Sequence, residues 1–114
     1  MGSRATTKEV MAIVKRPDER FGQMMHISIE LEDLQKMLCG YIEAIPHPGK
    51  DDCVILCNED GKLQHLPFNM WIPGDYLVGT VIVLGIDGED FAPVPIEFSE
   101  WKEWVKKWES EGEQ

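Results

Sequence analysis

Several features that would assign this 114-residue chain to a functional class are absent from its sequence. No apolar run approaches the ~18–20 residues that a membrane-spanning helix needs, so we expect no association with a membrane. No basic segment leads into an apolar one near residue 1, so we expect no secretory signal. A Walker loop, a G-x-G-x-x-G motif and a nucleophile at a recognised spacing are also missing. We therefore expect a protein that is not an enzyme and needs no cofactor.

Basic residues are scarce: 11 Lys and Arg stand against 21 Asp and Glu, for a net charge of −10. The imbalance is concentrated in residues 58–114, which carry twelve acids and four bases. Because an acidic surface repels phosphate backbones, we expect no direct binding of nucleic acid. A basic protein partner, a bound cation and mimicry of the charge of DNA all stay open. So does an acidic face that only keeps the protein soluble.

Cysteine is also scarce, with three residues in the chain. An odd number without a secretory signal suits a reducing cytoplasm better than a disulfide scaffold. His47, Cys53, Cys57 and His65 have the residue types of a zinc site. However, Cys53 and Cys57 would lie about 13 Å apart along a strand, too far to share one ion. We expect these cysteines to be buried in the core and expect no metal site.

The first half of the chain predicts a hairpin followed by a helix. Strands are expected over residues 11–15 and 21–29, separated by a turn at Pro17. The period then changes, and Leu31, Leu34, Met37 and Leu38 form the apolar stripe of an amphipathic helix. Gly40 is the expected end of this helix, because glycine adopts the left-handed conformation without a steric penalty.

The second half predicts strands at residues 41–45, 53–57, 62–66 and 76–86, with a short edge strand at 91–96. The run 53–57 is apolar throughout, which is typical of a strand buried on both faces. Asp60-Gly61 is a hairpin signal, and residues 67–74 between two prolines are expected to form a loop. A final helix begins at Ser99 as N-cap. Its aromatic face, which could be core or interface, consists of Trp101, Trp104 and Trp108.

These elements predict an α+β domain with a mostly antiparallel five- or six-stranded sheet and two short helices, in the order β-β-α-β-β-β-β-α. We expect a single domain over residues 11–109. Residues 1–10 are expected to be a flexible N-terminal extension or tag, and residues 110–114 a frayed tail.

The run from Leu34 to Phe91 resembles an uncharacterised family of small domains carried mainly by bacteriophages and mobile elements. The resemblance rests on five segments: Gly40-Tyr41-Ile42-Glu43, Cys57-Asn58-Glu59-Asp60-Gly61-Lys62-Leu63, Leu66-Pro67-Phe68-Asn69, Val78-Gly79-Thr80-Val81-Ile82-Val83 and Gly85-Ile86-Asp87-Gly88-Glu89-Asp90-Phe91. Some such domains occur beside antirestriction modules. The resemblance implies an accessory protein that acts against host defence in the bacterial cytoplasm, and it supplies no catalytic residues.

Two exposed segments are the candidate binding residues. One is the aromatic loop with Phe68, Met70 and Trp71, and the other is the acidic turn with Asp87, Glu89 and Asp90. Aromatic residues would anchor a host protein while the acids steer a basic partner toward them. Two alternatives stay open. The first is an oligomeric sponge for a signalling nucleotide, with Lys15, Arg16 and Arg20 as its only clustered bases. The second is an acidic mimic of DNA.

Overall fold

The computed structural model describes residues 8–112. These residues form eight strands and two helices. In chain order they are β1 (Glu9–Lys15), β2 (Gln23–Ser28), α1 (Leu31–Leu38), β3 (Ile42–Pro46), β4 (Cys53–Asn58), β5 (Phe68–Ile72), β6 (Asp75–Val78), β7 (Val81–Asp87), β8 (Asp90–Ala92) and α2 (Phe98–Gly112). Every strand pair among them is antiparallel. The predicted α+β class, with an antiparallel sheet of six strands and two helices, is confirmed.

The main sheet has six strands in the order β2-β1-β7-β4-β3, and β8 pairs with one end of β7. The inner strand β4, between β7 and β3, is buried along its whole length, as its apolar run predicted. Since successive side chains point to opposite faces, Cys53 and Ile55 enter one hydrophobic core while Val54 and Leu56 enter the other. The sheet therefore separates two cores.

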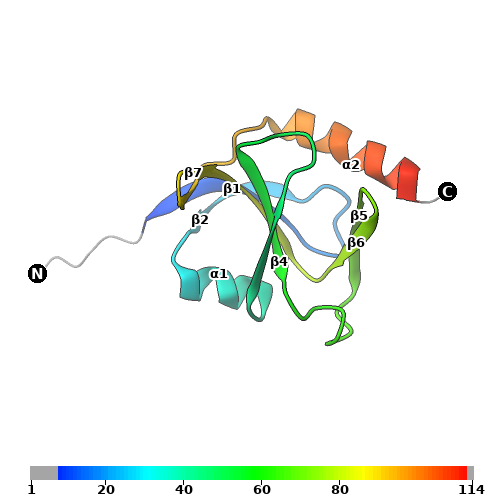
Figure 1. Ribbon diagram of the computed structural model, residues 1–114, viewed down its shortest axis with the longest axis horizontal. Coiled ribbons are helices and arrows are strands. Elements are labelled where there is room, and N and C mark those ends of the chain that lie inside the picture. The colour runs from blue at the N-terminus through cyan, green and yellow to red at the C-terminus, as the bar shows by residue number, and fades with distance from the viewer. Residues whose placement is uncertain (1–7, 113–114) are drawn as a thin grey trace, which may run out of the picture.

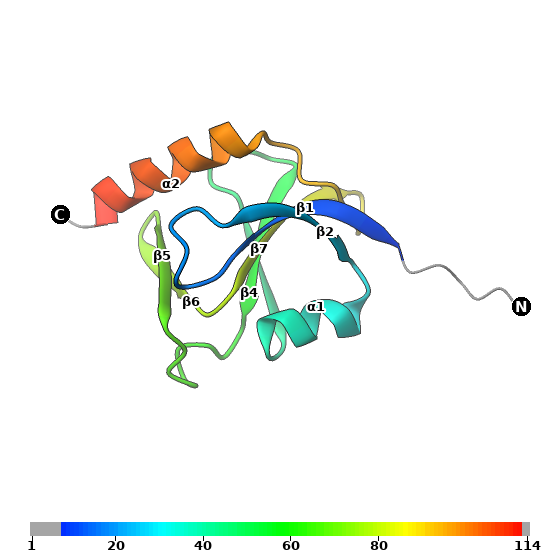
Figure 2. The same ribbon diagram turned by 180° about the vertical axis from the view of Figure 1, so that it is seen from behind.

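A helix covers each face of the sheet, as the two opposite views in Figures 1 and 2 show. On one face, Leu34 and Leu38 of α1 pack on an aliphatic core that includes Leu84. On the other face, α2 packs through Trp101 and Trp108, which are 0% and 2% exposed. The two-stranded sheet of β5 and β6 lies under the C-terminal half of α2 on this second face (Figure 1). Two of the three helical tryptophans thus belong to the core.

The hairpin and first helix form where they were predicted, but the helix ends differently. The left-handed residue is Cys39, with φ of 62°, rather than Gly40. The Gly40 N–H donates to the carbonyl of Gln35, which is the outer bond of a Schellman motif. Glycine is needed at position 40 for another reason: a Cβ there would lie 2.7 Å from the Asn58 side chain.

The predicted return strand over residues 62–66 is wrong, because this segment folds into hydrogen-bonded turns. The Gln64 N–H donates to the carbonyl of Asp60, and Leu66 N–H to that of Gly61. Asn58 organizes the segment: its Oδ1 accepts from the Asp60 N–H, and its Nδ2 donates to the carbonyl of Leu38 and to Gln64. These local bonds to an asparagine side chain override the hairpin signal.

The predicted loop over residues 67–74 is also wrong, because its middle is strand β5. Pro67 and Pro73 lie just outside the strand, so neither removes a donor from the ladder. Pro73-Gly74 forms the turn to β6, and Gly74 has φ of 79°, as a Pro-Gly turn of type II requires. The expected single strand over 76–86 is broken at Gly79, where φ is 73° and the chain leaves the hairpin for the main sheet.

The ends of the domain also differ from their predictions. Strand β1 begins at Glu9, and Val10 is buried, so residues 9 and 10 are part of the fold. Helix α2 begins one residue before Ser99 and continues through residues 110–112, which had been assigned to a frayed tail. The edge strand near residues 91–96 shrinks to the three residues of β8. Residues 1–7 and 113–114 lie outside the described part of the chain.

Candidate functional site

The β5–β6 hairpin presents three aromatic rings, Phe68, Trp71 and Tyr76, which we call the aromatic cluster. The ring centroids of Phe68 and Trp71 are 5.3 Å apart, those of Phe68 and Tyr76 6.0 Å, and those of Trp71 and Tyr76 6.1 Å. Phe68 is 47% exposed and Tyr76 38% exposed, while Trp71 is half-buried. Two rings of the cluster therefore offer apolar surface to solvent.

Trp71 is held in place from behind by the last turn of α2. A Cβ atom added at Gly112 would lie 2.4 Å from the Trp71 side chain, so only glycine permits this approach of the helix. The ring also packs at the edge of the core that contains Trp101. Trp71 is thus both part of the cluster and a support for it.

The predicted binding residue Met70 points into the core, where it is 3% exposed. Met70 is the neighbour of Trp71 in β5, so their side chains point to opposite faces. The strand register shifts between Phe68 and Met70, and Phe68 therefore lies with Trp71 rather than with Met70. Tyr76, which sequence reasoning missed, is brought to the cluster because it is the register partner of Trp71. The Pro73-Gly74 turn was the signal that would have revealed this pairing.

The acidic turn lies far from the aromatic cluster. Asp87 and Asp90 are paired at the end of the β7–β8 hairpin, and Gly88 between them has φ of 65°. Strand β7 begins at Val81, just after the hairpin, and runs six residues to Asp87, which is about 20 Å at 3.3 Å per residue. Figure 1 shows the labels of β7 and of β5 and β6 at opposite sides of the molecule. The structure does not bring the two predicted binding segments together.

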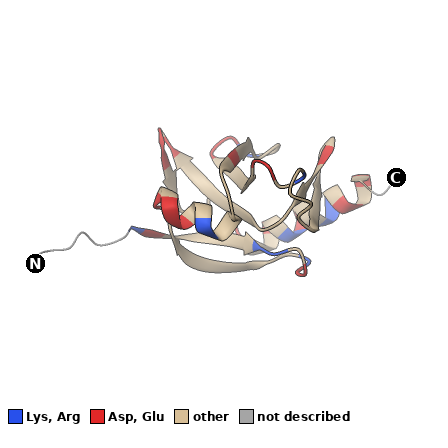
Figure 3. Cartoon of the chain, turned by 90° about the horizontal axis from the view of Figure 1, so that it is seen from below, with Lys and Arg blue, Asp and Glu red and all other residues tan. Residues whose placement is uncertain are grey.

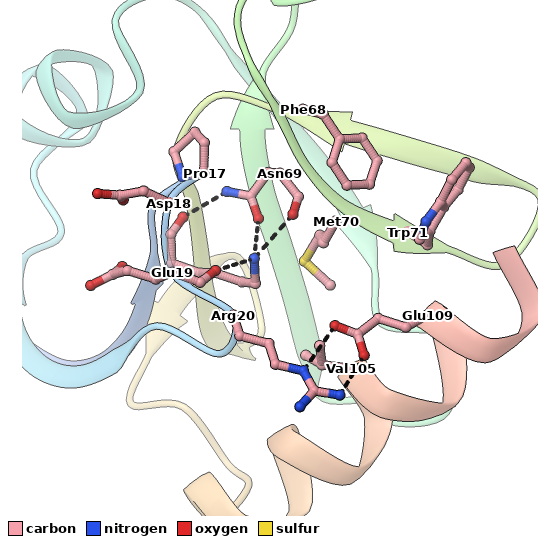
Figure 4. Close-up of a pocket in the computed structure, with 11 residues that line it drawn as sticks. Pro17, Asp18, Glu19, Arg20, Phe68, Asn69, Met70, Trp71, Val105 and Glu109 are labelled. Atoms are coloured by element: carbon pink, nitrogen blue, oxygen red, sulfur yellow. Dashed lines mark hydrogen bonds and ion pairs between the residues drawn. The ribbon is translucent and has the colours of Figure 1, made fainter. Parts of the chain in front are cut away.

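Beneath the hairpin, Lys15 and Asn69 form a buried polar cluster (Figure 4), which we call the Lys15–Asn69 cluster. Lys15 Nζ donates to Asn69 Oδ1 at 2.7 Å, to the Asn69 carbonyl at 3.1 Å and to the Glu19 carbonyl at 2.7 Å. Asn69 Nδ2 donates in return to the carbonyls of Lys15 and Gly79. Both side chains are at most 5% exposed. The cluster fastens β5 to β1 and to the turn that follows β1.

Burial lowers the pKa of the Lys15 ammonium from 10.5 to about 8, although Glu109 and Glu19 act to raise it. All three protons of the ammonium are donated to oxygens, so the group organizes the hairpin rather than offering a free amine. The sequence does not predict the contact between Lys15 and Asn69, because the two residues are 54 positions apart.

A cavity of about 240 Å³ opens above this cluster, between the β1–β2 turn, β5 and α2. Its rim carries the Arg20–Glu109 ion pair, in which Nη2 lies 2.9 Å from Oε1 and Nε lies 3.2 Å from Oε2 (Figure 4). Two further cavities adjoin the hairpin, one of about 230 Å³ next to β3 and β4 and one of about 400 Å³ at the end of α2. Three cavities of the described chain are thus lined in part by residues of the β5–β6 hairpin.

Cys53, Cys57 and His47 are core residues, whereas Cys39 is exposed. Burial raises the pKa of the Cys53 thiol to about 12 and that of Cys57 to about 11, so both remain protonated near neutral pH. The His47 ring packs between Trp104 and Trp108, with centroids 5.0 and 5.2 Å away, and its Nδ1 accepts from the Gly49 N–H. Burial lowers the pKa of His47, which keeps it neutral. Protonated thiols are poor nucleophiles, and the His47 ring is almost completely covered by the protein.

Charge is spread over the molecule rather than gathered on one face. Figure 3 shows acidic segments on both helices and at strand ends, with basic segments between them on α2. Within residues 8–112, no group of three or more His, Cys, Asp or Glu side chains is arranged to hold a metal ion. None of the helices in the described part is long and apolar enough to cross a membrane.

Comparison with known proteins gives one match. A family model described as a domain of unknown function, DUF3846, matches residues 10–109. No curated protein and no solved structure matches the chain. The matched residues run from the start of the sheet through most of α2 and include the aromatic hairpin and the Lys15–Asn69 cluster. The chain belongs to the DUF3846 family of domains of unknown function.

Proposed function

We propose that this protein acts by binding rather than by catalysis, as an accessory protein of a phage or mobile element that engages a host defence protein in the bacterial cytoplasm. The resemblance to a family carried by such elements supports the context. The observation that supports a binding role most strongly is the exposed aromatic cluster on the β5–β6 hairpin. Aromatic rings set on a rigid base are the side chains that most often dominate binding energy at protein interfaces.

The partner that fits this surface is a basic protein. The net charge of −10 attracts a positively charged partner over several ångströms before contact is made. The acidic turn at Asp87–Asp90 takes part through this long-range attraction, because it lies too far from the aromatic cluster to share one small contact patch. We therefore expect the cluster to supply affinity and the distributed acids to supply the rate of association.

The nucleotide-sponge alternative has less support. Of the three bases in the first turn, Lys15 already donates all of its protons, and Arg20 is ion-paired with Glu109. The cavity between them is also lined by Asp18 and Glu19, which repel phosphate. Mimicry of DNA would need rows of acids on one face, whereas the acids here are dispersed (Figure 3).

The test is affinity capture from a bacterial lysate with identification by mass spectrometry, using the protein and two alanine variants. Phe68→Ala removes an exposed ring of the cluster, and Leu31→Ala removes another exposed apolar side chain, from α1, as a control. The proposal expects a protein that is retained by the parent and by Leu31→Ala and lost with Phe68→Ala. Melting temperatures of both variants should stay within a few degrees of the parent. Equal retention by both variants, or nucleotide binding in calorimetric titration without any captured protein, would overturn the proposal.

A further inference from the structure

The largest cavity beside the hairpin lies between the β5–β6 turn and the end of α2, and we call it the hairpin–helix groove. Its volume is about 400 Å³. Trp71, Tyr76 and Pro73 supply apolar walls, and Asp75 and Glu111 supply carboxylates. The planes of the Trp71 and Tyr76 rings meet at 69°, which makes a corner rather than a flat surface. The groove therefore combines two π faces with negative charge.

Among residues 8–112, no basic side chain lines this groove, although basic residues line both of the other cavities beside the hairpin. The last turn of α2, within Phe98–Gly112, also carries no basic residue. Backbone carbonyls at a helix C-terminus add partial negative charge, which is usually offset by lysine or arginine. In this protein nothing among the described residues of that turn offsets it, so the groove favours a cation.

A cationic side chain of the chain itself binds Tyr76 and Asp75 on the side away from the groove. Lys62 Nζ lies 4.2 Å from the centroid of the Tyr76 ring and 2.6 Å from Asp75 Oδ1. The hydrogen bond from Lys62 lowers the pKa of Asp75, so the carboxylate is ionised near neutral pH. Lys62 reaches the hairpin from the side of β3 and β4 and does not line the groove. The groove side of the same two residues has no such occupant in the described chain.

We propose that the hairpin–helix groove receives an arginine side chain from a basic segment of the partner protein. A planar guanidinium stacks on an aromatic face and bonds to carboxylates at its edge, so the groove's two rings and two acids match arginine better than an ammonium. This inference rests on the proposed function, because the partner that brings the arginine is the one engaged by the aromatic cluster. The inference adds that an arginine side chain of the partner makes the contact with this protein specific.

The experiment is a titration of the full chain, followed by ¹⁵N-HSQC spectra, with N-acetyl-arginine methylamide as the probe. The four indole N–H resonances report separately on the four tryptophans. Trp71 lines the groove, Trp101 and Trp108 are buried, and Trp104 is half-buried on another surface of α2. We expect a saturable shift at Trp71 that exceeds the shifts of the other three. The uncharged analogue N-acetyl-citrulline methylamide should leave Trp71 unshifted.

Two charge variants on the same helix separate a specific groove from bulk attraction. Glu111→Gln removes a groove carboxylate and should weaken probe binding about two- to fivefold, as expected for a partly exposed ion pair. Glu103→Gln removes the same charge away from the groove and should leave binding unchanged. Lys62→Met frees Asp75 and one face of Tyr76 and should tighten binding.

The inference is overturned if Trp71 does not shift, if citrulline shifts it equally, or if Glu103→Gln and Glu111→Gln weaken binding to the same extent. A lysine probe that binds more tightly than the arginine probe would also overturn the assignment to arginine. If the probe fails while partner capture still depends on Phe68, only the groove assignment falls. If the probe binds while no partner depends on Phe68, the proposed function falls and the groove remains an arginine site.

Discussion

The β5–β6 hairpin and the β7–β8 hairpin are both turns of antiparallel strands at the surface, and they differ in what supports them. The first lies on the Lys15–Asn69 cluster and against the last turn of α2, with its aromatic rings only partly covered. The second ends in the three-residue strand β8, and its turn residues 86–90 are all exposed. One hairpin is held rigid from behind, and the other extends into solvent.

The difference suggests which hairpin was shaped for contact. Exposed aromatic rings lower the solubility of a protein. The β5–β6 hairpin that carries the aromatic cluster is nevertheless held in place by buried hydrogen bonds, which a free loop would lack. Acidic side chains at an exposed turn, by contrast, are well solvated and need no further explanation. We infer that the aromatic hairpin is the contact surface and that the acidic hairpin contributes charge.

The largest effect is expected from loosening the aromatic hairpin at its base. Asn69→Ala would remove one of the three acceptors of the Lys15 ammonium and the side-chain donor of the Lys15 and Gly79 carbonyls. We expect the free energy of unfolding to fall by about 3 kcal/mol, because a buried charge and two carbonyls lose hydrogen bonds. Urea denaturation measures this change. Gln23→Ala, at an exposed position, is the control, and an equally small change for both variants would contradict the role given to the cluster.

A smaller effect is expected in the pH dependence of stability. Burial lowers the pKa of Lys15 to about 8 from its ordinary 10.5, so between these pH values the unfolded chain holds a proton that the folded chain has released. The contribution of Lys15 to the free energy of unfolding therefore rises with pH across this window, by roughly 2 kcal/mol. Urea denaturation of the parent and of Lys15→Met at pH 8 and pH 10.5 measures this effect. The free energy of unfolding of the parent, relative to that of Lys15→Met, should be higher at pH 10.5 than at pH 8. Cys53 and Cys57 titrate in both proteins, so their effects cancel, and a difference that stays flat would be inconsistent with a buried ammonium.

The smallest effect is expected at the acidic hairpin. Asp87 and Asp90 face each other across the β7–β8 pair, and like charges directly opposite destabilise a hairpin. Asp90→Asn should raise the free energy of unfolding by about 0.2–1 kcal/mol, measured by urea denaturation. Glu89→Gln removes the same charge from a position without a facing acid and should change stability less. If both variants behave alike, only the net charge matters at this turn.

Much of the fold was predictable because its signals are local. The two-residue period of β2, the stripe of Leu34 and Leu38, and the continuous apolar run of β4 each reflect burial that a short window of sequence displays. The errors arose where a distant or side-chain interaction decides the local structure. Asn58 converts an expected strand into turns, and two prolines read as loop signals lie outside β5 rather than in it.

The candidate site was predictable only in part. Phe68 and Trp71 were identified because aromatic residues near prolines are conspicuous, and the structure places both on the exposed hairpin. Met70 was included wrongly in this surface, because neither the strand nor its register shift between Phe68 and Met70 was visible in a segment predicted to be a loop. Tyr76 joins as the register partner of Trp71, and the Pro73-Gly74 turn between them was a local signal for this pairing. Asn69 joins through a contact with Lys15 across 54 positions, which a short sequence window does not contain.

The measurement that tests the central claim most directly compares the two hairpins in one binding experiment. The affinity of the captured partner is measured by surface plasmon resonance for the parent, for Phe68→Ala, and for the combined variant Asp87→Asn, Glu89→Gln and Asp90→Asn. We expect Phe68→Ala to weaken binding at least about tenfold through faster dissociation. The combined acidic variant should change affinity less than about threefold, mainly by slower association at low salt. A tenfold loss in the acidic variant together with unchanged binding by Phe68→Ala would contradict the account.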